Sequence, residues 1–148
     1  MSVLITVNGD HCLSRSKSKV LRLIKCNVLN NDQLLDDNIK WKLIPRHSRT
    51  HAYNIVVPKE PSNCIDISGS NDPILEIYEC GNMQNNQLFS FKNGIMKSFI
   101  NEDSCVNIKD DGDDENRKKG LASKKNSIKL LWSTTCDTKN AKIGFIAI

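Results

Sequence analysis

Four side chains suited to binding a polyhydroxylated ring occur in the segment 64–91, among short apolar runs and turns. Asp66 follows a cysteine and an isoleucine, and its carboxylate can accept hydrogen bonds from two adjacent hydroxyl groups. Tyr78 lies two residues before the next cysteine, where its flat ring can stack on the apolar face of a sugar. Asn86 and Gln87 add amides that both donate and accept. This set suits carbohydrate recognition, but Asp66 and Gln87 could also serve only to tie turns together.

Catalysis and metal binding are not expected from the sequence. His11, His47 and His51 lie in a basic, polar context, and no motif pairs a nucleophile with them. Sugar hydrolysis needs two carboxylates flanking a cleft, and no such pair is recognisable. The run DDGDDE at 110–115 lacks EF-hand spacing, and the cysteines form no CxxC pair for zinc. We therefore predict no catalytic residue, no metal and no cofactor.

The segments that must position these side chains are short and apolar, with Gly, Asn, Asp or Pro at their ends. Several alternate with a period of two, as strands do. In ILEIYE, residues 74–79, Leu75 and Ile77 share one face while Glu76 and Tyr78 share the other. Other runs of this kind are VLITV, KVLRLIKC, KWKLI, YNIVV, LFSF, IKLLW and IGFIAI. No segment has the pattern of a long amphipathic helix, so the prediction is an all-β fold.

The six cysteines divide the chain into three similar units. Each unit opens with a cysteine and an aliphatic residue and has a second cysteine further on; the cysteines are Cys12 and Cys26, Cys64 and Cys80, and Cys105 and Cys136. A polar stretch then leads to an aromatic residue, which is Trp41, Phe89 or Phe145. Phe89 and Phe145 each lie nine positions after the second cysteine of their unit, and Trp41 lies fifteen after its own. Three units of about four short strands each predict a closed body, because closure removes exposed sheet edges.

The three units fill one predicted domain, 1–148, which is long enough for a real core. Their approximate bounds are 1–50, 51–97 and 98–148. The third unit carries a charged insertion at 109–127, which has no apolar face to bury and is expected to be an exposed, mobile loop.

These residues resemble the ricin B-type lectin family, whose repeats open on Cys-aliphatic-Asp-aliphatic and close on Gln-x-Trp. The resemblance rests on CIDIS, IYEC and NNQLF in the second unit, which closes on Gln87-Leu88-Phe89. The first and third units close on Ile39-Lys40-Trp41 and Ile143-Gly144-Phe145 and lack the glutamine. The resemblance implies a β-trefoil, a hairpin-capped barrel of about twelve short strands. It also implies a non-enzymatic module that binds a glycan of galactose or N-acetylgalactosamine type through Asp66, Tyr78, Asn86 and Gln87.

Two structural expectations follow from the same resemblance. Family members often close a disulfide within each repeat, which here would join Cys12 to Cys26, Cys64 to Cys80 and Cys105 to Cys136. In a reducing cytosol these residues would instead be small buried hydrophobes. The closing aromatics Trp41, Phe89 and Phe145 are expected in the core, around the pseudo-threefold axis.

The first and third units lack parts of the binding set. In the first, Ser14, Ile24 and Ile39 replace the acid, the aromatic and the glutamine. In the third, the acid, the aromatic and the two amides are replaced by Asn107, Thr134, Lys142 and Ile143. We therefore predict one site rather than three. Trp132 is either an outward stacking surface or a core residue, and the core is favoured because large aromatics mostly bury.

The charge distribution supports an alternative function. The net charge is +4, and residues 1–60 hold ten Lys and Arg against five acids. An interaction trefoil without sugar binding could dock a protein, a nucleic acid or another anionic polymer through this basic first repeat.

No apolar run approaches the roughly 20 residues of a membrane span. No signal peptide is recognisable, which favours the cytoplasm or non-classical export.

Overall fold

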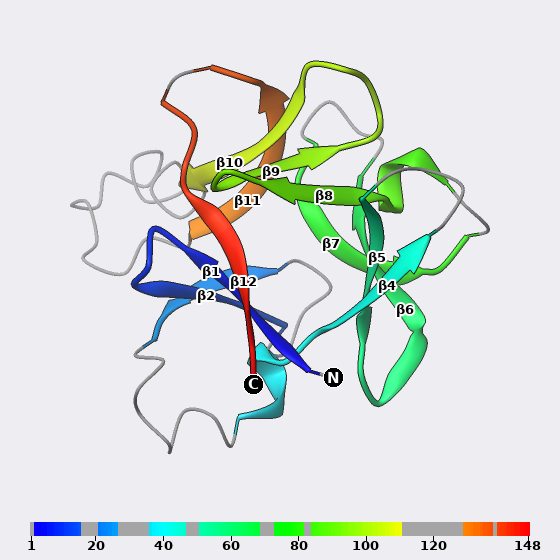
Figure 1. The fold of residues 1–148 in the computed structure, drawn as a ribbon. Helices are drawn as coiled ribbons and strands as arrows, with labels where there is room; N and C mark the ends of the chain where they lie inside the picture. The colour runs from blue at the N-terminus through cyan, green and yellow to red at the C-terminus, as the bar shows by residue number, and fades with distance from the viewer. Residues whose placement is uncertain are drawn as a thin grey trace, which may run out of the picture.

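The computed structural model describes residues 2–15, 21–26, 36–46, 51–68, 73–81, 84–110, 129–137 and 139–148. Within these ranges the chain forms twelve β-strands and two short 3-10 helices (Figure 1). The elements are β1 Val3–Val7, β2 His11–Ser14, β3 Arg22–Lys25, η2 Asp37–Ile39, β4 Lys42–Arg46, β5 Ala52–Val57, β6 Glu60–Ile67, β7 Leu75–Glu79, η3 Asn85–Gln87, β8 Phe89–Lys92, β9 Ile95–Ser98, β10 Ser104–Asp110, β11 Lys129–Thr135 and β12 Ile143–Ala147.

Six of the strands form a ring. Antiparallel pairs join β12 to β1, β4 to β5, β5 to β8 and β8 to β9. The link from β1 to the start of β4 is made by Val3 and Trp41, which exchange hydrogen bonds of 2.8 and 2.9 Å. The link from β9 back to β12 is a 2.8 Å bond from the Ile143 amide to the Gly94 carbonyl. The ring brings the two ends of the chain together, and the Ile148 amide bonds to the Ser2 carbonyl at 3.0 Å (Figure 1).

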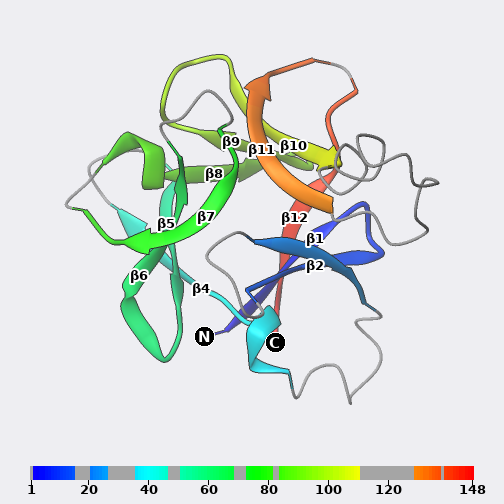
Figure 2. The same cartoon turned by 180° about the vertical axis from the view of Figure 1, so that it is seen from behind.

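The other six strands form three hairpins, β2–β3, β6–β7 and β10–β11. The hairpins contact one another: the Leu21 amide bonds to the Leu75 carbonyl at 3.4 Å, and the Ser133 amide bonds to the Pro73 carbonyl at 2.8 Å. From behind, β7 and β11 lie next to each other (Figure 2). A strand ring closed on one side by three hairpins is the predicted β-trefoil architecture, so the predicted fold class is confirmed.

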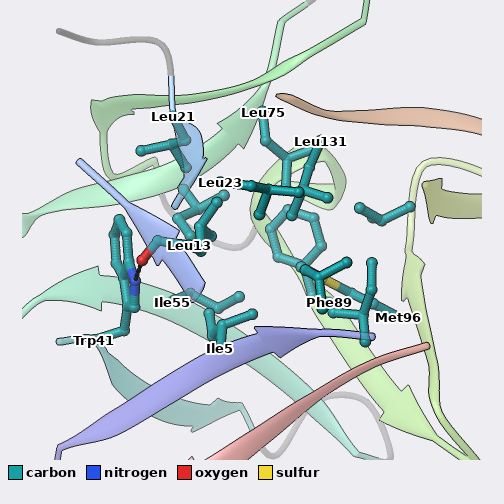
Figure 3. Packing of buried hydrophobic residues seen from close by; sticks show 14 of the residues in the cluster. Ile5, Leu13, Leu21, Leu23, Trp41, Ile55, Leu75, Phe89, Met96 and Leu131 are labelled. Carbon is teal, nitrogen blue, oxygen red and sulfur yellow. Dashed lines mark hydrogen bonds between the residues drawn. The ribbon is translucent and has the colours of Figure 1, made fainter. Parts of the chain in front are cut away.

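The core lies inside the ring and beneath the hairpins. Trp41 and Phe89 are fully buried, as predicted for closing aromatics, and Figure 3 shows them on either side of Ile5 and Ile55. The Trp41 indole Nε1 donates a 3.1 Å hydrogen bond to the Leu13 carbonyl, which satisfies its polar atom in the core. The aliphatic residues that follow the opening cysteines are also buried; they are Leu13, Ile65 and Val106.

The placement of Phe145 was predicted wrongly. Its side chain is 42% exposed, and its ring meets the edge of Phe91 at a centroid distance of 5.3 Å. The equivalent of Trp41 in the third repeat is Ile143, which is fully buried and bonds to Gly94 as Trp41 bonds to Val3. The cysteine-to-aromatic spacing misled because the third repeat reaches its closing position seven residues after its second cysteine, not nine.

Three disulfides staple the hairpins, one in each repeat. They join Cys12 to Cys26, Cys64 to Cys80 and Cys105 to Cys136, with Cα–Cα distances of 5.8, 5.1 and 5.0 Å. The predicted pairing is confirmed. Disulfides of this kind persist in oxidising compartments and restrict the unfolded chain.

The predicted insertion at 109–127 begins too early, because Lys109 and Asp110 are the last residues of β10. Its residues 111–127 lie outside the described ranges. Within those ranges, no helix is long and apolar enough to cross a membrane.

Candidate functional site

The β6–β7 hairpin places Asp66 and Tyr78 on one face. In its antiparallel register, Cys64 lies opposite Tyr78 and Asp66 lies opposite Glu76. Directly opposed residues share a face, and so do residues two apart on one strand. The intervening residues, Ile65, Ile67, Leu75 and Ile77, form the inner face that packs in the core or against it. Asp66 and Tyr78 therefore both project from the outer face of the hairpin.

Two amides from the η3 segment hold the Asp66 carboxylate. Asn86 Nδ2 lies 3.2 and 3.1 Å from its two oxygens, and Gln87 Nε2 lies 2.7 Å from Oδ2. Burial raises the pKa of Asp66, and the hydrogen bonds from Gln87 and Asn86 oppose this by favouring the carboxylate. Within the described ranges Oδ1 receives only the Asn86 amide, so it retains acceptor capacity, although Asp66 as a whole is buried.

Gln87 is placed to support the site rather than to contact a ligand. Its side chain is 0% exposed, and Nε2 also donates to the Glu79 carbonyl at 2.9 Å. Its Oε1 accepts from the Gly81 amide at 2.8 Å. Both amide hydrogens are therefore committed inside the protein. Gln87 fixes Asp66 to the end of β7.

Tyr78 and Asn86 are the accessible members of the set. The Tyr78 side chain is 56% exposed, the largest exposure recorded for a large apolar or aromatic residue in the described part of the chain. Asn86 is partly buried, and its Nδ2 also lies 3.4 Å from the Ile67 carbonyl. The exposed ring of Tyr78 and the partly buried amide of Asn86 lie beside the Asp66 carboxylate, which is only 6% exposed. Together they form a polar surface with one apolar patch, which fits a sugar ring better than an apolar ligand.

The equivalent surface of the third repeat is built differently. Asn107 occupies the Asp66 position, and its Oδ1 accepts from the amides of Ile108 and Ala141 at 2.9 and 3.0 Å. Trp132 lies opposite Asn107 on the outer face, which is partly exposed, with Lys109 Nζ 5.0 Å from the centre of its ring. The preference for a core position of Trp132 was therefore wrong.

The structure also corrects the residues equivalent to Asn86 and Gln87 in the third repeat. With Ile143 as the closing residue they are Asn140 and Ala141, not Lys142 and Ile143. Asn140 escaped the sequence prediction, although one signal was available. An asparagine lies three residues before the closing position of every repeat, as Asn38, Asn86 and Asn140. The Asn140 Oδ1 accepts from the Asp137 amide at 3.3 Å, whereas its buried Nδ2 has no partner among the described residues.

Three basic groups in or next to the first repeat already have partners within the protein. The Arg15 guanidinium donates to the Lys40 carbonyl and lies 5.2 Å from the centre of the Trp41 ring, and burial lowers its pKa. Lys40 and Lys59 pair with Asp37 at 3.5 and 2.7 Å. Ser14 and Ile39, which replace the acid and the glutamine of the second repeat, are buried. The surface near η2 therefore offers an anionic partner fewer unpaired cations than the composition indicates.

Comparison with known proteins adds the fold but not a family. No protein-family model matches the chain, and no curated protein matches it. Solved structures do match it, and among them are two natural proteins and one designed protein. A mosquitocidal holotoxin is 13% identical over 97% of this chain, with a TM-score of 0.67. The Polyporus squamosus lectin, bound to the epitope Neu5Acα2-6Galβ1-4GlcNAc, is 15% identical over 97%, with a TM-score of 0.61. ThreeFoil, a designed threefold-symmetric protein, is 12% identical over 99%, with a TM-score of 0.55.

These likenesses show the β-trefoil fold. The chain spans 16% of the holotoxin chain and 48% of the Polyporus lectin chain, but 99% of ThreeFoil. At such low identity the fold can host unrelated functions. The function of this chain has to be argued from its own surface.

Proposed function

We propose that this protein is a carbohydrate-binding module with one site, on the outer face of the β6–β7 hairpin. The observation that carries the proposal is the Asp66 carboxylate, held by two amides on the same hairpin face as the exposed ring of Tyr78. A fixed acceptor beside a flat ring meets the two requirements of sugar recognition. A lectin among the structural neighbours is consistent with this use of the fold.

Each residue has a separate role in the proposed site. Tyr78 stacks on the C–H face of the sugar, and Asp66 accepts hydrogen bonds from hydroxyls on its rim. Asn86 orients the carboxylate and offers its remaining amide capacity to the ligand. Gln87 is a positioning residue, since it is fully buried and acts through Asp66. A galactose or N-acetylgalactosamine type of glycan is the proposed ligand class.

The site acts without chemistry on the sugar. A single shallow site is expected to bind with a dissociation constant of roughly 0.1–1 mM, so useful avidity requires several copies or a larger assembly. The absence of catalysis remains a prediction.

A glycan array and a calorimetric titration with galactose, lactose and N-acetylgalactosamine test the proposal. We expect millimolar or tighter binding by the natural protein and loss of at least tenfold in Tyr78→Ala. Phe145→Ala, which removes another exposed ring away from the hairpin face, is the matched control and should bind normally. Lack of binding to every sugar, together with salt-sensitive retention on heparin or RNA, would replace the proposal with the anionic-partner function.

A further inference from the structure

We propose that Glu76 makes this site select sugars by charge, so that an ammonium-bearing hexosamine binds more tightly than the neutral hexose and an anionic sugar binds more weakly. The inference rests on the proposed function and assigns a specificity-determining residue to the same site.

The register of the hairpin places Glu76 beside Asp66. The two residues are directly opposed on β6 and β7, and opposed residues have Cβ atoms about 4.5–5.5 Å apart. Glu76 shares its face with Tyr78, two residues further along β7, and is partly exposed. Glu79 alternates onto the other face, opposite Asn63. Glu76 is thus the second carboxylate on the face that carries the stacking ring.

In the described part of the chain, no lysine, arginine or histidine forms an ion pair with either carboxylate. The groups that bond to Asp66 are the neutral amides of Asn86 and Gln87. The ion pairs found within the described ranges belong to Asp10 and Asp37, and none reaches Asp66 or Glu76.

The sequence around the two carboxylates is also acidic, which adds to the negative charge near the proposed site. Residues 60–91 contain five acids and no Lys, Arg or His; the acids are Glu60, Asp66, Asp72, Glu76 and Glu79. All 21 Lys and Arg residues of the chain lie elsewhere, although the net charge is +4. The segment that carries the proposed site is therefore locally negative in a basic protein.

A negative surface of this kind discriminates between ligands of equal shape. A charge a few ångströms from a carboxylate at a partly exposed site is attracted or repelled enough to change affinity by about three- to tenfold. The effect weakens with salt, because exposed charges are screened over about 10 Å at 0.1 M ionic strength. Stacking on Tyr78 does not depend on this charge, so a neutral sugar binds in either case.

Titrations with four sugars at pH 6 and low salt test the assignment: galactosamine, galactose, N-acetylgalactosamine and galacturonic acid. The natural protein should bind galactosamine about three- to tenfold more tightly than galactose, and galacturonic acid more weakly by a similar factor. N-acetylgalactosamine, which has an uncharged substituent at the same carbon, should follow galactose. In 0.5 M salt the galactosamine advantage should shrink toward onefold.

Two matched variants identify the residue responsible. Glu76→Gln should reduce the galactosamine advantage by at least half and leave galactose affinity within twofold, whereas Glu79→Gln should keep the advantage. Equal affinity for galactose and galactosamine in the natural protein, or an advantage that survives in Glu76→Gln, would overturn the assignment while leaving the sugar site in place. Failure of galactose itself to bind would instead overturn the proposed function.

Discussion

The second and third repeats place different side chains at the same scaffold positions. In the second, the carboxylate of Asp66 is shared by side-chain amides, and the neighbouring ring of Tyr78 is exposed. In the third, the equivalent Asn107 accepts two backbone amides, and Thr134 replaces the ring. In the proposed site, Asp66 Oδ1 keeps acceptor capacity beyond its bond from Asn86, whereas Asn107 uses its Oδ1 to hold its own turn. The same trefoil position can therefore serve binding or scaffolding, depending on where its hydrogen bonds go.

The largest expected effect concerns the closing positions of the two repeats. Phe89→Ala should destabilise the protein by about 3–5 kcal/mol, because it leaves a cavity in the core. Phe145→Ala should cost less than about 1 kcal/mol, because that ring is 42% exposed and the core position is taken by Ile143. Urea denaturation curves of the two variants measure the difference. Similar losses of unfolding free energy in both variants would indicate that Phe145 is a core residue and would contradict the assignment of Ile143 as the closing residue.

Replacing two of the disulfides in turn should affect protein stability and sugar binding differently. Replacing Cys64 and Cys80, or Cys105 and Cys136, by Ala should lower the unfolding free energy by about 2–5 kcal/mol in either case. Only the first pair should also weaken sugar binding, since Cys80 adjoins the Gly81 amide that holds Gln87. Thermal melting and sugar titration of both variants check this. If the two replacements weakened sugar binding equally, the proposed site would not depend specifically on the Cys64–Cys80 disulfide.

The comparison also explains what could be predicted from sequence. Period-two alternation in runs such as ILEIYE depends on local backbone geometry, so the strands and the outward face of Tyr78 were predictable. The six cysteines predicted three repeats, and the resemblance predicted the disulfides. Neither the alternation nor the cysteines could identify the closing residue of the third repeat. Ile143 and Phe145 are two positions apart on β12 and share a face, and they differ in burial, which only the structure shows.

The role of Gln87 could not be predicted for a different reason. The residue type is equally suited to binding a hydroxyl and to bonding internally. Only the fold shows that its partners are Asp66, the Glu79 carbonyl and the Gly81 amide. The asparagine shared by all three repeats was visible in the sequence but became meaningful only once the closing positions were aligned by their hydrogen bonds.

Removing the side-chain acceptor at position 66 or 107 distinguishes the second repeat from the third. Asp66→Ala should abolish measurable sugar binding and cost about 1–3 kcal/mol, because it leaves the buried Gln87 amide without its acceptor. Asn107→Ala should cost a similar amount of stability and leave binding unchanged. Calorimetric titration combined with chemical denaturation measures both quantities. Loss of binding in Asn107→Ala would show that the third repeat contributes to the site.

A smaller effect is expected from pH. Since burial raises the pKa of Asp66, its carboxylate should take up a proton at a higher pH than an exposed aspartate does. Sugar affinity should therefore be full at neutral pH and fall on acidification, with a midpoint above the ordinary aspartate value. Titrations between pH 3.5 and 7 measure the midpoint, and affinity that stays constant across this range would argue against a role for the Asp66 carboxylate.

The most direct test of a single site in the second repeat is a galactose titration followed by the side-chain amide resonances of Asn86 and Asn140. These residues occupy equivalent positions in two repeats. The Asn86 resonances should shift saturably, and those of Asn140 should stay fixed. Unmoved Asn86 resonances, or equal saturable shifts at both residues, would contradict the account.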